Sequence, residues 1–337
     1  MRKLLLAFAL ILLLAAPAFA TSWYACTSGG NINASNQFTS STGVACGSCS
    51  GNYLTWPPSN GDTLYSNNCA SAIVIPPTIN VGSTSVQVTL TNTAGSGNAG
   101  GSFSYALTSG DTSTLYANIT AGAAAVLTIT GSAGTLNIGA SGYPVTITGG
   151  TAASAYGVSD SHTSVTVNVY ATINGGSNAT AYAYYFSGAS GSVSITGNAT
   201  AGTGGAALYL AGAGTGTING NCHGGDTSVN QVGCQAASSG DLFVTGNLIF
   251  GKRASAVAGA IRWQPANVNN KILFPWSDSA TTGTWNQYSV EAPPMVNQTM
   301  TGGPGIYSVS NVVSGVVYGD QTGTASTSTG VGGVYAY

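Results

Sequence analysis

The chain has 337 residues, of which 49 are glycine and only 4% are charged, and its formal net charge at pH 7 is −2. Proteins that bind nucleic acid or an anionic membrane surface need a basic patch, and the absence of Lys and Arg between Lys3 and Lys252 excludes both classes for most of the chain. Disorder is the competing interpretation of so much glycine, but 43% of the residues are hydrophobic, which is enough to form a core.

Residues 1–20 have the pattern of a Sec-type signal peptide. A basic start, Met1-Arg-Lys3, precedes an apolar run from Leu4 to Leu14, and Ala18-x-Ala20 supplies the cleavage site. The apolar run is shorter than the roughly 20 residues of a membrane-spanning helix. The sequence therefore predicts export to the cell surface or the medium, with no membrane span in the mature protein.

Residues 21–72 are predicted to form an N-terminal cap that is stapled by disulfides. Four cysteines lie here, namely Cys26, Cys46, Cys49 and Cys69. In an exported chain an even number of cysteines indicates disulfides, and three connectivities are open for these four. The alternative for Cys46-x-x-Cys49 is a redox or zinc half-site, but no histidine and no βαβ pattern lie nearby.

Aromatic residues of this cap have two possible roles. Trp23, Tyr53 and Trp56 can contact sugar rings or a partner, or they can pack as the core of the cap itself. Packing is the simpler interpretation, and Trp23 and Trp56 stay as weak binding candidates.

Residues 73–265 are predicted to form a parallel β-solenoid (a single-stranded parallel β-helix), so the fold class is all-β. A short β-type run followed by a turn begins at residues 145, 165, 193, 216 and 242, a spacing close to the length of one solenoid coil. The third residue of each run is apolar, mostly with polar neighbours, which is typical of a strand with one buried face. Stacked coils should place these side chains in one interior column: Ile147, Val167, Ile195, Ile218 and Val244.

A second apolar run recurs at residues 155–158, 181–186, 206–210 and 258–261. Its tyrosines Tyr182, Tyr184 and Tyr185 are weak candidates for a sugar-binding surface. Alternation places Tyr182 and Tyr184 on one face and Tyr185 on the other, so one of these sets must be buried. Tyrosines exposed on three adjacent coils would favour binding, whereas buried tyrosines would favour a plain scaffold.

Cys222 and Cys234 bracket a loop that a disulfide would close. Lateral loops of this kind are where solenoids carry function. His223 and Asp226 in the loop are therefore a possible acid/base pair, and Asp241 is a third weak catalytic candidate. A solvated turn is the simpler interpretation of the pair.

Catalysis has little support in the sequence, and we expect that the protein is not an enzyme. His162 lies near Asp160, but β-helix glycosidases need paired carboxylates, and residues 73–251 contain four widely spaced acids and no cation. Asp226 and Asp241 can meet on adjacent coils only if the coil lengths allow it. No cluster of histidines and cysteines suggests a metal site, and no cofactor is expected.

Residues 266–337 are predicted to form a Trp- and Pro-rich C-terminal cap followed by a Gly/Ser/Thr tail. Trp263, just before this boundary, and Trp276 would cover the last coil. Short apolar runs in the tail favour joining of subunits by strand addition, and a flexible linker is the alternative.

The pattern of residues 73–265 resembles the parallel β-helix proteins that Gram-negative bacteria export or that phage tails carry, which include adhesins, passenger-type surface proteins, tail spikes and polysaccharide-cleaving enzymes. The resemblance is one of fold. It implies an extracellular structural or adhesive solenoid that self-associates, for example into surface filaments, or that binds cell-surface glycans. The alternative is a carbohydrate-binding or polysaccharide-cleaving β-helix protein of the tail-spike or lyase type.

Overall fold

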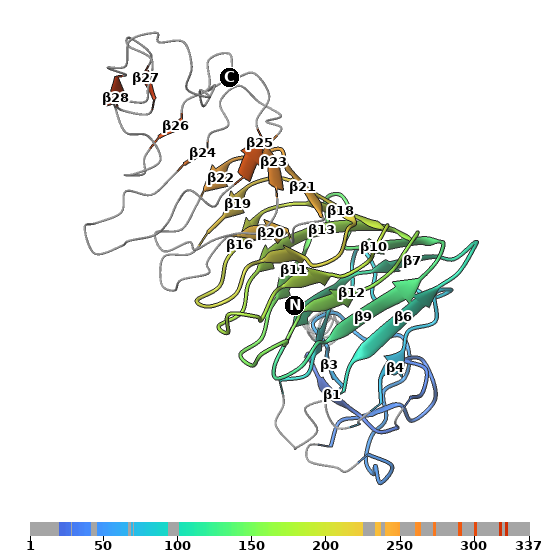
Figure 1. Cartoon of the computed structure of the whole chain (residues 1–337). Helices are drawn as coiled ribbons and strands as arrows, with labels where there is room; N and C mark the ends of the chain where they lie inside the picture. Colours follow the sequence, from blue (N-terminus) through green and yellow to red (C-terminus); the bar gives the residue numbers. More distant parts are fainter. Residues whose placement is uncertain are drawn as a thin grey trace, which may run out of the picture.

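A computed structural model describes residues 20–247 apart from 28, 42–45, 67–68, 70, 94–100, 225–232 and 237–239, and beyond 247 only the backbone of short strands. The chain winds into coils that stack in parallel along one axis (Figure 1). A complete coil contributes one strand to each of three faces. The prediction of an all-β parallel solenoid is confirmed.

The first face has seven strands, which pair in parallel. They are β4 (Ile73–Val74), β6 (Phe103–Leu107), β9 (Leu127–Gly131), β12 (Val158–Asp160), β14 (Tyr184–Phe186), β17 (Leu208–Leu210) and β20 (Cys234–Ala236).

The second face follows the first in each coil. Its strands are β7 (Thr112–Leu115), β10 (Thr135–Ile138), the first part of β13 (Thr166–Asn174), β15 (Ser192–Thr196), β18 (Thr215–Asn219), β21 (Asp241–Val244), β23 (Ala260–Trp263) and β25 (Ser289–Glu291).

The third face closes the coil. Its strands are β1 (Ser22–Ala25), β3 (Thr63–Tyr65), β5 (Val88–Thr91), β8 (Ala117–Thr120), β11 (Val145–Thr148), the second part of β13, β16 (Ala199–Thr200), β19 (Cys222–His223), β22 (Leu248–Ile249), β24 (Ile272–Leu273) and β26 (Met300–Thr301). Parallel pairing therefore extends beyond residues 73–265 on both sides. The strands β27 (Val317–Tyr318) and β28 (Gln321–Thr322) pair with each other in antiparallel fashion.

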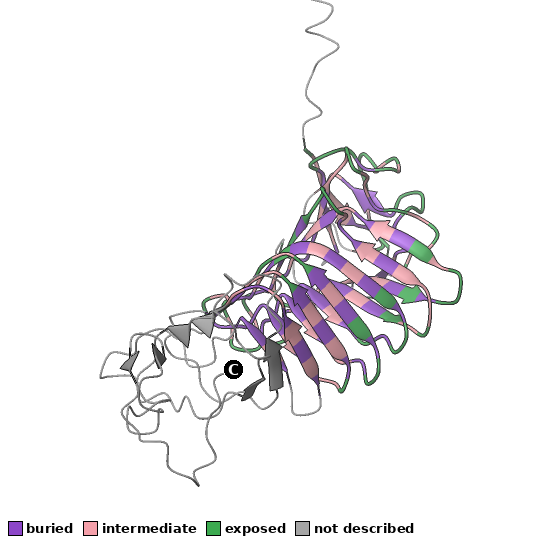
Figure 2. Cartoon of the chain, turned by 90° about the horizontal axis from the view of Figure 1, so that it is seen from above, coloured by how far each residue is buried: buried purple, intermediate pink, exposed green. Residues whose placement is uncertain are grey.

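The core consists of apolar columns that run along the axis. Successive residues of a strand point alternately inward and outward, and Figure 2 shows buried segments alternating with partly buried and exposed ones. On the second face Ile195 pairs with Ile218, and Ile218 pairs with Val244, so that three fully buried side chains follow one another.

The prediction of a single column for all five residues is wrong for two of them. Ile147 lies on the third face, where it pairs with Ile173. Val167 lies on the second face but pairs with Val193, one alternation away from Ile195. The runs that begin at residues 145 and 165 belong to different faces of successive coils, which explains why their spacing is shorter than a coil.

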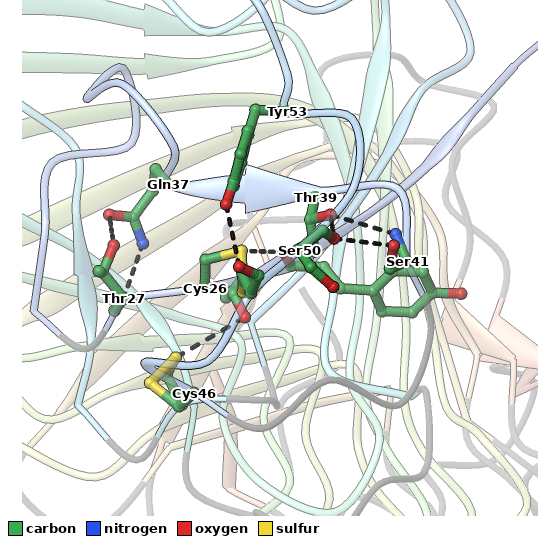
Figure 3. Close-up of a disulfide and its surroundings, with 12 residues drawn as sticks. Cys26, Thr27, Gln37, Thr39, Ser41, Cys46, Ser50 and Tyr53 are labelled. Atoms are coloured by element: carbon green, nitrogen blue, oxygen red, sulfur yellow. Dashed lines mark hydrogen bonds between the residues drawn. A yellow bond between two sulfur atoms is a disulfide. The ribbon is translucent and has the colours of Figure 1, made fainter.

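The N-terminal end is closed by a disulfide-linked cap. The disulfides are Cys26–Cys49 and Cys46–Cys69, which resolves the three connectivities left open by the sequence. The edge strand β2 (Phe38–Thr39) pairs with β1 in antiparallel fashion. Figure 3 shows the polar contacts of the cap, including the 2.8 Å bond from Nε2 of the buried Gln37 to the Thr27 carbonyl.

Several predictions lie outside the described residues. They concern residues 1–19 of the predicted signal peptide, the side chains of Trp263 and Trp276, and most of the tail. Within the residues described, no helix is long and apolar enough to cross a membrane.

Candidate functional site

Four tyrosines from three adjacent coils stack on the outside of the first face. We call Tyr156, Tyr182, Tyr185 and Tyr209 the tyrosine ladder. The ring centroids of Tyr156 and Tyr185 are 4.4 Å apart and those of Tyr182 and Tyr209 are 4.7 Å apart, with interplanar angles of 6° and 25°. These distances are close to the separation of neighbouring strands, so each stacked pair joins one coil to the next.

The ladder departs from the alternation expected for residues 182–185. The strand β14 begins only at Tyr184, so Tyr182 lies at a corner where a period of two does not apply. Its ring stacks with the outward-facing Tyr185 at 6.0 Å, while Tyr184 points inward and is fully buried. The sequence interpretation missed Tyr156 and Tyr209, which lie about one coil before and after this cluster.

The stacking limits what the ladder can bind. A sugar packs against the open face of an aromatic ring, but the ladder rings stack on one another's faces. Tyr182 is only 9% exposed. The geometry therefore favours a role in holding coils together over a role as a row of sugar platforms.

Burial in the ladder changes the acidity of its phenols. Desolvation, together with smaller contributions from the neighbouring phenols of Tyr209, Tyr156 and Tyr185, raises the pKa of Tyr182 from 10.0 to about 12. The pKa of Tyr185 is raised for the same reasons. The folded state thus favours the neutral phenol.

This shift predicts a loss of stability at high pH. The folded-state pKa of Tyr182 exceeds the ordinary value of 10.0, so its contribution is fully present below pH 10 and is lost as the pH rises to about 12. Replacing Tyr182 by phenylalanine should reduce the fall in the unfolding temperature over this interval, measured by circular dichroism. Tyr53→Phe, on the exposed cap surface, is the control and should leave the fall unchanged; equal effects of the two variants would contradict the assignment.

A second polar cluster is sealed inside the solenoid. The Asp160 carboxylate accepts a 2.6 Å hydrogen bond from the Tyr184 hydroxyl and lies 2.6 Å from Nδ1 of His162. All three side chains are fully buried. Burial raises the pKa of Tyr184 well above its ordinary value, and the adjacent Asp160 carboxylate raises it further. The pair singled out in the sequence thus has a third member, but no access to solvent.

The other candidate acids and bases are not brought together. His223 ends β19 on the third face and is exposed, whereas Asp241 begins β21 on the second face. Asp226 lies outside the described residues. Among the described residues, no group of three or more His, Cys, Asp and Glu side chains could hold a metal ion.

The loop between Cys222 and Cys234 is closed as the sequence suggested. The disulfide joins β19 on the third face to β20 on the first face, and both cysteines are buried in the core. The disulfide therefore bridges the corner between the third face of one coil and the first face of the next.

The cap tryptophans are half-buried and pack against the core. The indole Nε1 of Trp23 donates a 3.0 Å hydrogen bond to the buried Asp62 carboxylate, which also accepts bonds from the backbone N–H groups of Thr21 and Ser59. Trp56 precedes a cis peptide bond to Pro57. Both tryptophans thus contribute to the packing of the cap.

Comparisons with protein-family models, with curated proteins and with solved structures found no match. The function of the chain is therefore inferred from its own residues.

Proposed function

We propose that the protein is an extracellular structural scaffold, a rigid solenoid that persists outside the cell. The observation that carries this proposal is that side chains outside the core also bind one coil to the next. The tyrosine ladder is one such device, and a series of asparagine side chains is the other.

The asparagines act at the turns between the second and third faces. Oδ1 of Asn198 accepts a 3.1 Å hydrogen bond from the backbone N–H of Asn221, and Oδ1 of Asn221 accepts a 2.8 Å bond from that of Asn247. The same contact joins Asn60 to Gln87 at 2.8 Å. Each bond satisfies a turn N–H that has no place in the strand ladder. These contacts support a scaffold in which side chains at the turns fix coils to their neighbours.

The compartment agrees with this role. Three disulfides indicate an oxidising, extracellular environment. The solenoid coils also present mainly Thr, Ser and Asn side chains on their outer surface, with very little charge. A scaffold of this kind offers few sites to proteases that cleave after Lys or Arg.

A catalytic role is not part of the proposal. The Asp160–His162 pair is enclosed in the core, where a substrate cannot reach it. His223 and Asp241 lie on different faces. An acid/base reaction needs both groups within hydrogen-bond reach of one substrate.

The structure of the N-terminal end favours separate molecules over end-to-end filaments. The edge strand β2 runs antiparallel to β1, and Thr39 of β2 forms an antiparallel bridge with Tyr53. A second solenoid stacking in register would need a parallel edge at this end. Self-association into filaments would therefore have to use another surface.

The proposal predicts that coil-to-coil side-chain contacts govern resistance to proteolysis. The full-length oxidised protein should yield a long-lived fragment with a nonspecific protease. Asn221→Ala removes the acceptor for Asn247 and should increase the cleavage rate about fivefold, which corresponds to a hydrogen bond worth about 1 kcal/mol.

The matched control is Asn219→Ala, two residues away, whose side chain donates a solvent-exposed 3.2 Å bond to the Ser194 hydroxyl on the preceding coil. This bond satisfies no backbone N–H and is accessible to water, so its loss should raise the cleavage rate by less than about twofold. Rapid digestion of the unmodified protein would contradict a persistent scaffold. Electron microscopy of the same samples at rising concentration should show separate particles. Long fibres would instead show that the scaffold assembles into filaments.

A further inference from the structure

A groove crosses three adjacent coils at the corner between the second and third faces. Its walls are two tight turns that project from the coils on either side. Ser83 and Val86 exchange backbone hydrogen bonds of 2.8 and 3.2 Å in one turn, and Ala140 and Tyr143 exchange bonds of 3.1 and 2.9 Å in the other. The strands that follow, β5 and β11, both pair with β8, which lies between them.

The middle coil has no such turn. Only Tyr116 separates β7 from β8, so the chain passes directly from the second face to the third. The N–H of Tyr116 donates a 2.8 Å bond to the Val81 carbonyl, and the Tyr116 carbonyl accepts a 3.2 Å bond from the Val88 N–H. Two projecting turns around a coil that lacks one leave a hollow, and Tyr116 lies in it.

A side chain braces the groove across all three coils. Nε2 of Gln87 donates a 3.3 Å bond to the Pro144 carbonyl two coils away, and Oε1 of Gln87 accepts a 3.5 Å bond from Asn118 on the coil between. The backbone N–H of Gln87 is bound in turn by Oδ1 of Asn60 at 2.8 Å. The groove is therefore formed before any ligand arrives, which lowers the entropic cost of binding.

The chemistry of the lining restricts the ligand. The groove has a volume of about 410 Å³, and none of the nine described residues that line it is charged. They supply hydroxyl and amide groups, and two phenols. Two large hydrophobic side chains are exposed in the described part of the chain, Tyr53 and Tyr143. Tyr143 is the more exposed of the two, at 48%.

We propose that this groove binds a neutral carbohydrate. Side-chain amides and hydroxyls both donate and accept hydrogen bonds, as sugar hydroxyls do. A charged ligand would lack an ion partner here, and sites for purely apolar ligands are lined mainly by hydrophobic groups. The open Tyr143 ring adds an apolar surface with a polar hydroxyl at its edge. Unlike the rings of the tyrosine ladder, it has no aromatic stacking partner among the described residues.

This inference goes beyond the scaffold role, because it assigns a ligand class to a surface of the scaffold. Its failure would leave the resistance of the solenoid to proteolysis untouched. Both roles together would make the protein an adhesive scaffold.

The test uses the full-length protein and an array of neutral oligosaccharides built from glucose, galactose, mannose and N-acetylglucosamine, with sulfated and carboxylated glycans beside them. We expect binding to at least one neutral glycan, and this binding should persist at high salt. Tyr143→Ala and Thr84→Trp, which fills the groove from an exposed turn position, should each weaken binding at least about tenfold.

Tyr53→Ala is the matched control, because Tyr53 is the other exposed large hydrophobic residue and lies in the N-terminal cap. It should leave the affinity unchanged, and all variants are checked for unchanged circular dichroism. The proposal would be overturned if the protein bound no neutral glycan or bound only charged glycans. It would also be overturned if both groove variants bound with unchanged affinity.

Discussion

Replacement of Asp160 by alanine is expected to destabilise the solenoid by about 2–6 kcal/mol, because it leaves two buried polar side chains without their partner at about 1–3 kcal/mol each. The carboxylate accepts hydrogen bonds from the Tyr184 hydroxyl and from the backbone N–H of His162, and it contacts Nδ1 of the His162 ring. Nε2 of His162 already has no hydrogen-bond partner within the described part of the chain. Without Asp160, a buried phenol and a buried imidazole would lose their partner together.

The measurement is the urea midpoint of the purified protein, with hydrogen exchange to locate the change. Exchange should accelerate first in β12 and in its parallel neighbours β9 and β14. Asp111→Ala is the control, because Asp111 accepts bonds from Thr108 in a surface turn and its loss should cost about 1 kcal/mol or less. Similar midpoints for the two variants would refute a structural role for the buried cluster.

The double replacement Cys46→Ser and Cys69→Ser is expected to release the N-terminal cap while the central coils stay folded. The two cysteines are 23 residues apart, and cross-linking a loop of that length stabilises by about 3 kcal/mol in the chain-entropy model. Each coil contacts mainly its neighbours, so a loss at one end should remain local. Hydrogen exchange should rise in β1, β2 and β3 and remain low in β15 and β18.

The comparison is the double replacement Cys222→Ser and Cys234→Ser, which opens a loop of 12 residues in a later coil. Its effect should be similar in size but centred on β19 and β20. If either double variant unfolded the whole chain in one transition, the coils would be more strongly coupled than the local contacts imply.

The recurrence of short apolar runs with Gly- and Asn-rich turns was enough to predict the solenoid, because a β-coil cannot bury its apolar face without a neighbour. The register was harder to predict. Ile147 and Val167 look equivalent along the chain, yet they lie on different faces. One coil contains several similar strands, and a sequence pattern with a period of two does not say which face a strand occupies.

The candidate sites were predictable only in part. The loop closed by Cys222 and Cys234 followed from cysteine spacing, and alternation predicted that either Tyr184 or Tyr185 is buried without saying which; the structure buries Tyr184. The position of Tyr182 did not follow from the sequence, because the corner before β14 breaks the alternation. The groove beside Tyr116 depends on a coil that lacks a turn between two coils that have one, and this is a difference in loop length that residue types do not reveal.

The position of the cap has a consequence for how the protein forms. Each described coil pairs with the coil that precedes it in the sequence, and the disulfide-linked cap precedes them all. A coil that forms next to a finished coil meets a strand edge on which to align. We therefore expect the coils to add in order from the disulfide-linked cap, once the chain has reached the oxidising compartment in which the cap disulfides form.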